Sequence, residues 1–218
     1  MHPAYSVIFF TTATGAGYGL LACIGIFAFL GFIEAGFWFR LVSLGIAVAL
    51  ISAGLLSSTA HLGRPERAWR AFSQWKSSWL SREGVAAVAT FIPTAAFGLG
   101  WVLLGLDGGW TAAAGLLSAI GAAVTVSTTG MIYASLKPIA QWSSRYTLPA
   151  YLIFAVMTGC VLFNALLSSF GQPLLWVQIT SLLLTGCGWA WKRATWRHND
   201  GQVTGTTLNS ATGLMGGE

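Results

Sequence analysis

Charged residues are scarce in this chain. They make up 8% of its 218 residues, whereas soluble domains carry about a quarter. Hydrophobic residues account for 55% of the sequence, and the mean hydropathy is +0.69. Because so little charge cannot cover the surface of a soluble protein, we predict an all-α, polytopic transmembrane helix bundle.

Cysteine and histidine are also rare. The three cysteines lie singly in apolar segments without a CxxC pair, which argues against an iron–sulfur cluster or a zinc site held by this chain alone. A buried b-type haem usually needs two axial ligands on facing helices. The histidines, His2, His61 and His198, all fall at or outside the predicted membrane boundary. We therefore expect no haem.

Acidic residues are outnumbered, since six acids face eleven bases for a net charge of +5. The bases flank the hydrophobic segments, so membrane topology explains them better than nucleic-acid binding. The first apolar run begins near Val7 and exceeds the 7–15 residues of a signal-peptide core, so we expect it to be a retained span.

Long apolar runs, by contrast, are abundant. A helix needs about 20 apolar residues to cross a bilayer. Gly15 and Gly19 in the first run form a GxxxG pair, which favours close approach of another helix. Six segments have the required length and together predict a bundle over residues 1–193: 7–33, 37–60, 84–106, 110–136, 147–170 and 174–191. The polar remainder, 194–218, is predicted to be a tail or loop.

The positions of the basic residues predict the orientation. If the six spans alternate in direction, ten of the eleven bases fall on one face and only Arg40 falls on the other. This asymmetry predicts that the ten-base face is cytoplasmic. The N-terminus, the loop 61–83, the loop 137–146 and the C-terminal tail would then be cytoplasmic.

The loop 61–83 concentrates the polar chemistry. Pro65 is suited to begin a helix, and aromatic residues then recur at steps of three and four, which predicts an amphipathic helix on the membrane surface. The aromatic positions are Trp69, Phe72, Trp75 and Trp79. Ser81 is predicted to cap the third span, with Glu83 in its first turn.

Each of these residues also has a purely structural explanation. His61 at a helix C-terminus and Glu83 at a helix N-terminus both interact favourably with the helix dipole. Tryptophans at a membrane boundary usually form an aromatic belt. The combination is more informative, because an imidazole and a carboxylate bracket one surface helix at a depth where ionisable groups often mark functional sites.

Such a pair suits a quinone, whose reduction takes up two electrons and two protons. We expect His61 to donate a hydrogen bond to a quinone carbonyl, Glu83 to relay protons and Arg64 to stabilise developing negative charge. Trp75, Trp79 and Tyr133 are weaker candidates for lining the quinone-binding cleft. For docking of a partner protein, the candidates are Arg64, Arg67 and Arg70.

Several motifs make the sequence similar to a known family. The segments HPAYSVIFFTT, STAHLGRPERAW, SSWLSREG and MIYASLKPIAQW resemble the membrane-anchor subunit of the dimethyl sulfoxide reductase family. The resemblance covers nearly the whole chain, and its most specific part is HLGRPxRAW with SSWLSRE. By motif it implies that His61 and Glu83 belong to a quinol site. Family members generally have eight spans, two more than this sequence predicts.

The resemblance also implies partners and cofactors. The anchor would bind a four-cluster iron–sulfur subunit, which contacts another subunit that holds molybdopterin, and it would exchange electrons with ubiquinone or menaquinone without haem. A cytoplasmic basic face favours resemblance to cytoplasm-facing sulfite dehydrogenases. The alternative within the family is an anchor that oxidises menaquinol for a reductase of dimethyl sulfoxide or a related acceptor.

Two further hypotheses come from other classes of protein. A proton-coupled small transporter could use His61 and Glu83 as a relay, but transporters usually place ionisable groups near the bilayer midplane. A purely structural anchor would leave the quinone site to a neighbouring subunit.

Overall fold

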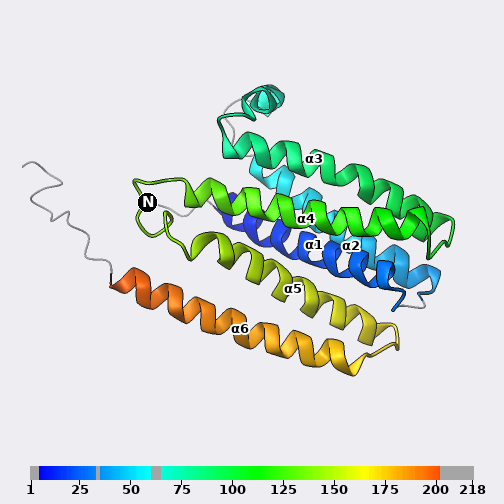
Figure 1. Ribbon diagram of the computed structural model, residues 1–218. Helices are drawn as coiled ribbons and strands as arrows, with labels where there is room; N and C mark the ends of the chain where they lie inside the picture. Colours follow the sequence, from blue (N-terminus) through cyan, green and yellow to red (C-terminus); the bar gives the residue numbers. More distant parts are fainter. Residues whose placement is uncertain (1–4, 33–34, 60–64, 202–218) are drawn as a thin grey trace, which may run out of the picture.

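The computed structural model describes residues 5–32, 35–59 and 65–201. All regular structure within these residues is helical, which confirms the predicted all-α class. Six long helices run roughly alongside one another, and a short helix lies across one end of the bundle (Figure 1). Their bounds are α1 Tyr5–Leu30, α2 Phe37–Thr59, η1 Pro65–Gln74, α3 Trp79–Gly98, η2 Leu99–Leu103, α4 Trp110–Ala134, α5 Thr147–Ser169 and α6 Leu175–Asp200.

Among the described helices, five are long and apolar enough to cross a membrane, one fewer than the six predicted spans. They are α1, α2, α3 with η2, α4 and α5. The sixth helix, α6, is as long as α1 but reaches Asp200, well beyond the predicted span 174–191. Its last turns carry basic residues, so its apolar part covers only the first portion of the helix.

The α1 helix is the centre of the bundle, since it packs against α2, α4 and α5. The α3 helix packs on α4, and α6 packs on α5 at the edge of the molecule (Figure 1). Small residues allow this close packing. A side chain at Gly19 would collide with the backbone of Ala155 on α5, and one at Gly25 would collide with the backbone of Gly115 on α4.

Only one glycine of the predicted GxxxG pair is used for helix contact. Gly19 touches α5, whereas a Cβ atom at Gly15 would have no neighbour within 4 Å among the described residues of other elements. The α1 and α5 helices therefore meet closely at Gly19 and leave open space one turn away, at Gly15.

The start of α3 differs from the sequence prediction. The helix begins at Trp79, and Ser78 is its N-cap, with the Ser78 side chain accepting a hydrogen bond from the Ser81 backbone N–H. The prediction that Ser81 caps this helix is therefore wrong, and so is the placement of Glu83 in the first turn. Ser78 and Ser81 both occur in the run SSWLS. Ser78 is the cap because the helix already begins at Trp79, which places Ser81 inside its first turn.

The short helix η1 has 3-10 rather than α geometry. It starts at Pro65 as predicted, but Trp79 belongs to α3 and not to the surface helix. The ring of Phe72 packs over Gly84, where an added Cβ would come within 3.1 Å of the ring, and so ties η1 to α3. In Figure 1, η1 is seen nearly end-on beside the start of α3.

We call the end of the bundle formed by residues 65–82, 135–146 and 192–201 the basic end. These segments lie at the same end in Figure 1, on the left. They carry the described basic residues other than Arg40: Arg70, Lys76, Arg82, Lys137, Arg145, Lys192, Arg193 and Arg197. The structure thus gathers at one end the charges that the alternating spans predict there.

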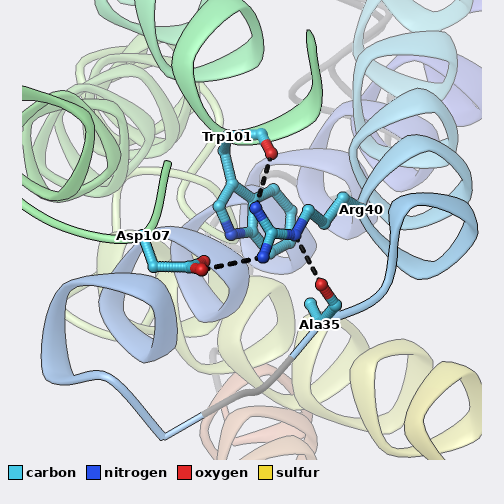
Figure 2. A network of polar contacts seen from close by, with 4 residues as sticks. All are labelled: Ala35, Arg40, Trp101 and Asp107. Atoms are coloured by element: carbon cyan, nitrogen blue, oxygen red, sulfur yellow. Dashed lines mark hydrogen bonds and ion pairs between the residues drawn. The ribbon is translucent and has the colours of Figure 1, made fainter. Parts of the chain in front are cut away.

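The opposite end is held by a buried arginine. Arg40 is 8% exposed, and its guanidinium donates hydrogen bonds to the carbonyl oxygens of Ala35 at 2.6 Å and Trp101 at 2.9 Å. It also forms an ion pair with Asp107 at 2.8 Å. Figure 2 shows these three contacts converging on one side chain. Arg40 therefore joins the α1–α2 connection to η2 and the α3–α4 loop.

Candidate functional site

The centre of the candidate site is Glu83, one turn inside α3. Its side chain is only 5% exposed. The α3 and α4 helices are antiparallel neighbours, so the first turns of α3 face the last turns of α4. There the Thr129 hydroxyl donates a 2.5 Å hydrogen bond to Glu83 Oε1 and also contacts the Thr125 carbonyl at 3.0 Å.

The Glu83 carboxylate lacks a basic partner within the described part of the chain, where Arg40 and Asp107 form the one ion pair. A buried carboxylate without a cation is costly, because an ion in apolar surroundings loses its hydration. Ionisable residues inside membrane helices are rare for this reason and usually serve a function. Glu83 therefore needs an explanation beyond packing.

Three phenols come near Glu83 from three different helices. Tyr18 of α1, Tyr133 of α4 and Tyr151 of α5 lie within electrostatic range of its carboxyl group. The rings of Tyr133 and Tyr151 stack with centroids 5.5 Å apart. The rings of Trp142 and Tyr133 meet edge to face, with centroids 5.3 Å apart. We call Glu83, Thr129, Tyr18, Tyr133 and Tyr151 the Glu83 cluster.

Hydroxyl groups extend the polar region further into the bundle. Thr125 on α4 and Thr90 on α3 have their hydroxyl oxygens 3.1 Å apart. The hydroxyl of Tyr18, a residue only 2% exposed, lies near Thr125. Within the described residues this phenol has no hydrogen-bond partner. An unsatisfied buried hydroxyl costs about 1–3 kcal/mol. The Tyr18 hydroxyl is therefore a donor that another group beside Glu83 could use.

A groove on the outer surface of the bundle reaches the cluster. It has a volume of about 430 Å³ and lies between α1, α5 and α6 toward the basic end. Its lining is mostly apolar, but it includes Tyr151 of the Glu83 cluster, Lys192 and three threonines. A second groove of about 560 Å³ lies between α3 and α4, with walls that are almost entirely apolar.

The predicted site residues divide into three groups. Glu83 and Tyr133 are brought together as part of one cluster. Trp75 is exposed, while Trp79 is partly buried and its ring stacks under the Arg82 guanidinium at 4.3 Å. His61, Arg64 and the side chain of Arg67 lie outside the described residues.

Arg82 has a structural role that the sequence prediction missed. Its guanidinium donates hydrogen bonds to the carbonyl oxygens of Trp75 at 2.9 Å and Lys76 at 2.7 Å. These bonds hold the turn between η1 and α3, and Arg82 thereby fixes the direction in which η1 leaves the bundle. The exposed guanidinium of Arg70 lies over the Trp69 ring at 5.5 Å.

Sequence reasoning did not identify Tyr18, Tyr151 or Thr129 as part of the site. Tyr18 and Tyr151 stand inside long apolar runs, where an ionisable phenol is itself a weak signal. Thr125 and Thr129 are four residues apart, which places both on one helix face. That pattern is common in membrane helices, where threonine hydroxyls bond to their own backbone, so only helix packing shows which hydroxyl meets the carboxylate.

Comparison with known proteins now bears on this arrangement. Residues 1–188 match the family described as DMSO reductase anchor subunit (DmsC). The chain belongs to this anchor-subunit family. The match covers α1 to α5 and the apolar part of α6, and it includes every residue of the Glu83 cluster.

A sulfite dehydrogenase subunit from Allochromatium vinosum is similar to this chain. The two are 35% identical over 229 aligned positions, which cover 98% of this chain and 70% of the relative. No solved structure matches the chain. Membership of the anchor family identifies this chain as the membrane-anchor subunit of an oxidoreductase complex.

Proposed function

We propose that this anchor subunit reacts with quinone and passes electrons between an iron–sulfur partner subunit and the quinone pool. The partner would carry four clusters and dock on the basic end, and a third subunit would hold molybdopterin and act on the substrate. The basic end would face the cytoplasm of a bacterial inner membrane, in keeping with the excess of basic residues there.

The observation that carries this proposal is the Glu83 cluster. It combines a buried carboxylate that lacks a described cation with three phenols at the end of the bundle where the basic loops gather. A bound quinone supplies two-electron, two-proton chemistry. The cluster fits such a ligand, because it offers hydroxyl donors and a proton-exchanging carboxylate beside a lipid-facing groove.

The side chains have separate tasks in this proposal. Glu83 exchanges protons with a quinone oxygen, and Thr129 holds the carboxylate in position through the 2.5 Å hydrogen bond. Tyr133 and Tyr151 supply hydroxyl groups for hydrogen bonding to the headgroup. His61 is proposed as a further donor and Arg64 as a stabiliser of negative charge, both in the segment between α2 and η1.

If the anchor holds no haem, electrons pass directly between the partner's iron–sulfur cluster and the quinone, with no carrier in between. Electrons must then cross in one step, so the quinone site and the partner must share one end of the bundle. Arg64, Arg67 and Arg70 are the proposed docking residues, and Arg70 is exposed on η1 at the basic end. The location of Glu83 near the same end satisfies this requirement.

Sulfite is the proposed substrate of the complex. The relative from Allochromatium vinosum is named as part of a sulfite dehydrogenase, and a basic end in the cytoplasm would place substrate oxidation there. The second candidate is an anchor that oxidises menaquinol for a dimethyl sulfoxide reductase, which the description of the family favours. Membership of an anchor family weighs against the transporter hypothesis.

The test begins with the complex purified from its native membrane in a mild detergent. We expect additional subunits, molybdenum and iron to co-purify, and sulfite to reduce a soluble quinone analogue. Elution of the chain alone and free of metal, in a detergent that preserves related complexes, would overturn the proposal. Electron flow from a reduced quinone to dimethyl sulfoxide, without sulfite oxidation, would select the reductase.

The Glu83→Gln variant then tests the site within the assembled complex. It keeps the size of the side chain but removes the proton-exchanging group, and we expect quinone-dependent turnover to fall at least tenfold. Turnover with a water-soluble acceptor that draws electrons from the catalytic subunits should remain at the wild-type rate. Unchanged quinone kinetics in this variant and in His61→Ala would instead support a structural anchor.

A further inference from the structure

The groove between α1, α5 and α6 arises from the way two helices diverge. The α1 and α5 helices touch through Gly19 on one side and Ala155 and Gly159 on the other. One turn nearer the basic end, Gly15 faces open space, since no described heavy atom beyond its own helix backbone lies within 4 Å of where its Cβ would be. The separation leaves a groove of about 430 Å³ on the outside of the bundle.

The walls of this groove suit an apolar molecule that arrives from the lipid. Ala16, Ala155, Phe154 and Met157 supply apolar surface, and the groove opens on the side of the bundle that the bilayer would cover. A volume of about 430 Å³ falls in the range of small-molecule sites. The groove therefore has room for a substituted aromatic ring.

Tyr151 connects the groove to the buried carboxylate. It forms part of the groove wall, and its ring stacks on Tyr133 with centroids 5.5 Å apart. Both phenols lie within electrostatic range of Glu83. A ligand in the groove thus meets, through one side chain, the hydroxyl network that leads to Glu83.

We propose that this groove is the quinone-binding pocket, with the Tyr151 hydroxyl donating a hydrogen bond to a quinone carbonyl. The proposal rests on the quinone reactivity proposed above and assigns the place where the headgroup enters and binds. The headgroup lies against Gly15 and Tyr151, the tail leaves toward the lipid, and Tyr133 links the bound carbonyl to Glu83.

The groove of about 560 Å³ between α3 and α4 is a less suitable pocket. Its walls contain no tyrosine and no charged side chain. The polar side chains that line it are Trp110 and Thr90, and the Thr90 hydroxyl already contacts Ala86 and Thr125. A phospholipid chain would also fit the apolar walls of the α1–α5–α6 groove, with its phosphate at Lys192. A phospholipid would make no use of the stacked phenols of Tyr133 and Tyr151, so we assign the groove to quinone.

The test fills the groove in the intact complex. The Gly15→Phe variant places a ring in the open space, and we expect it to raise the KM for a quinone analogue at least tenfold. The matched control is Ala113→Phe, which fills the α3–α4 groove near its far end and should leave that KM within twofold of wild type. Turnover with a water-soluble acceptor should be unaffected in both variants, and co-purification of the partner subunits with the variant anchor verifies that the complex has assembled.

Tyr151→Phe provides the second measurement. It keeps the ring and its stacking but removes the hydroxyl, so we expect a three- to tenfold rise in KM with a smaller change in kcat. A photoreactive quinone should label peptides of α1 or α5 in the wild type and lose that labelling in Gly15→Phe. A complex that reduces quinone normally in both variants would overturn the groove assignment, whereas a wild-type complex inert toward quinone would overturn the proposed function itself.

Labelling should also distinguish quinone from lipid. If the groove instead retains a co-purified phospholipid, with quinone labelling confined to α3 and α4, the assignment is wrong. If labelling of α1 or α5 is competed by excess quinone but not by added phospholipid, the assignment is supported.

Discussion

Thr129 determines where the Glu83 carboxylate lies. Its hydroxyl is the hydrogen-bond donor to Glu83 Oε1, and its γ-methyl remains if the residue becomes valine. We expect Thr129→Val to lower quinone-dependent turnover about three- to tenfold, because loss of one hydrogen bond to a charged group is worth about 1.5–3 kcal/mol before compensation by the remaining contacts. Steady-state rates with a quinone analogue measure the effect.

The neighbouring threonine supplies the control. The Thr128 hydroxyl donates to the Thr125 carbonyl of its own helix at 2.8 Å. Thr128→Val therefore makes the same chemical change next to the site, and turnover should stay within twofold of wild type. Equal losses in the two variants would show that the Thr129 effect comes from α4 as a whole.

At the scale of single residues, the sequence identifies the ionisable residue of the site more readily than the residues that surround it in space. Glu83 stands out because an acid beside a long apolar run is unusual. Its partners do not, since Thr129 resembles many membrane threonines and Tyr18 is separated from Glu83 by more than sixty residues of sequence. Their meeting depends on the packing of α1, α3 and α4, which local sequence does not encode.

The contact between α1 and α5 depends on glycine. At Gly19 even a methyl group would collide with the Ala155 backbone, which cannot rotate away. We expect Gly19→Ala to destabilise the protein by about 2 kcal/mol, or about 5 °C in Tm for a chain of this size. Thermal unfolding in detergent measures the change.

Gly45 on α2 is the comparison for this variant. A Cβ at Gly45 has no neighbour within 4 Å, so Gly45→Ala should leave the Tm unchanged or raise it slightly through better helix propensity. If Gly45→Ala lowers the Tm as much as Gly19→Ala does, the close approach of α1 and α5 is not the cause.

Arg40 fastens the other end of these helices. Its removal would strand two buried backbone carbonyls, those of Ala35 and Trp101, and we expect Arg40→Met to cost about 3 kcal/mol. Asp107 is different, because 56% of its side chain is exposed. Asp107→Asn should cost less than about 1 kcal/mol. If Arg40→Met and Asp107→Asn lower the Tm equally, the ion pair, rather than the carbonyl contacts, is what stabilises this end of the bundle.

The helices themselves follow from the sequence with small errors at their ends. Apolar length predicts α1, α2, α4 and α5 to within a few residues. The start of α3 is missed because Ser78 and Ser81 carry equivalent capping signals. The π-helical turn η2 at Leu99–Leu103 has no local signal. The carbonyl in its middle, that of Trp101, accepts a hydrogen bond from Arg40, which is far away in sequence.

The whole molecule places its basic loops and the Glu83 cluster toward one end. If substrate and quinone protons exchange on that same side, turnover moves no net charge across the membrane. We expect complexes reconstituted in vesicles to oxidise sulfite with quinone without building a membrane potential. A voltage-sensitive dye measures this, and a potential that an ionophore abolishes would contradict the expectation.

The overall architecture is the most predictable level. Scarce charge, long apolar runs and the ten-to-one distribution of bases are properties of the entire chain, and they survive local errors such as the misplaced cap of α3. The sequence does not predict that α1 lies at the centre, because burial on several sides leaves no hydrophobic period to detect.

The contacts of Arg40 form in a fixed order during synthesis of the chain. Arg40 belongs to the first helical hairpin, but Trp101 and Asp107 follow it by 61 and 67 residues and reach the membrane with the second hairpin. A ribosome must therefore finish α3 and its loop before the arginine finds these two partners. Until then the Arg40 guanidinium lacks two of its three partners, and docking of the first hairpin against the second supplies them.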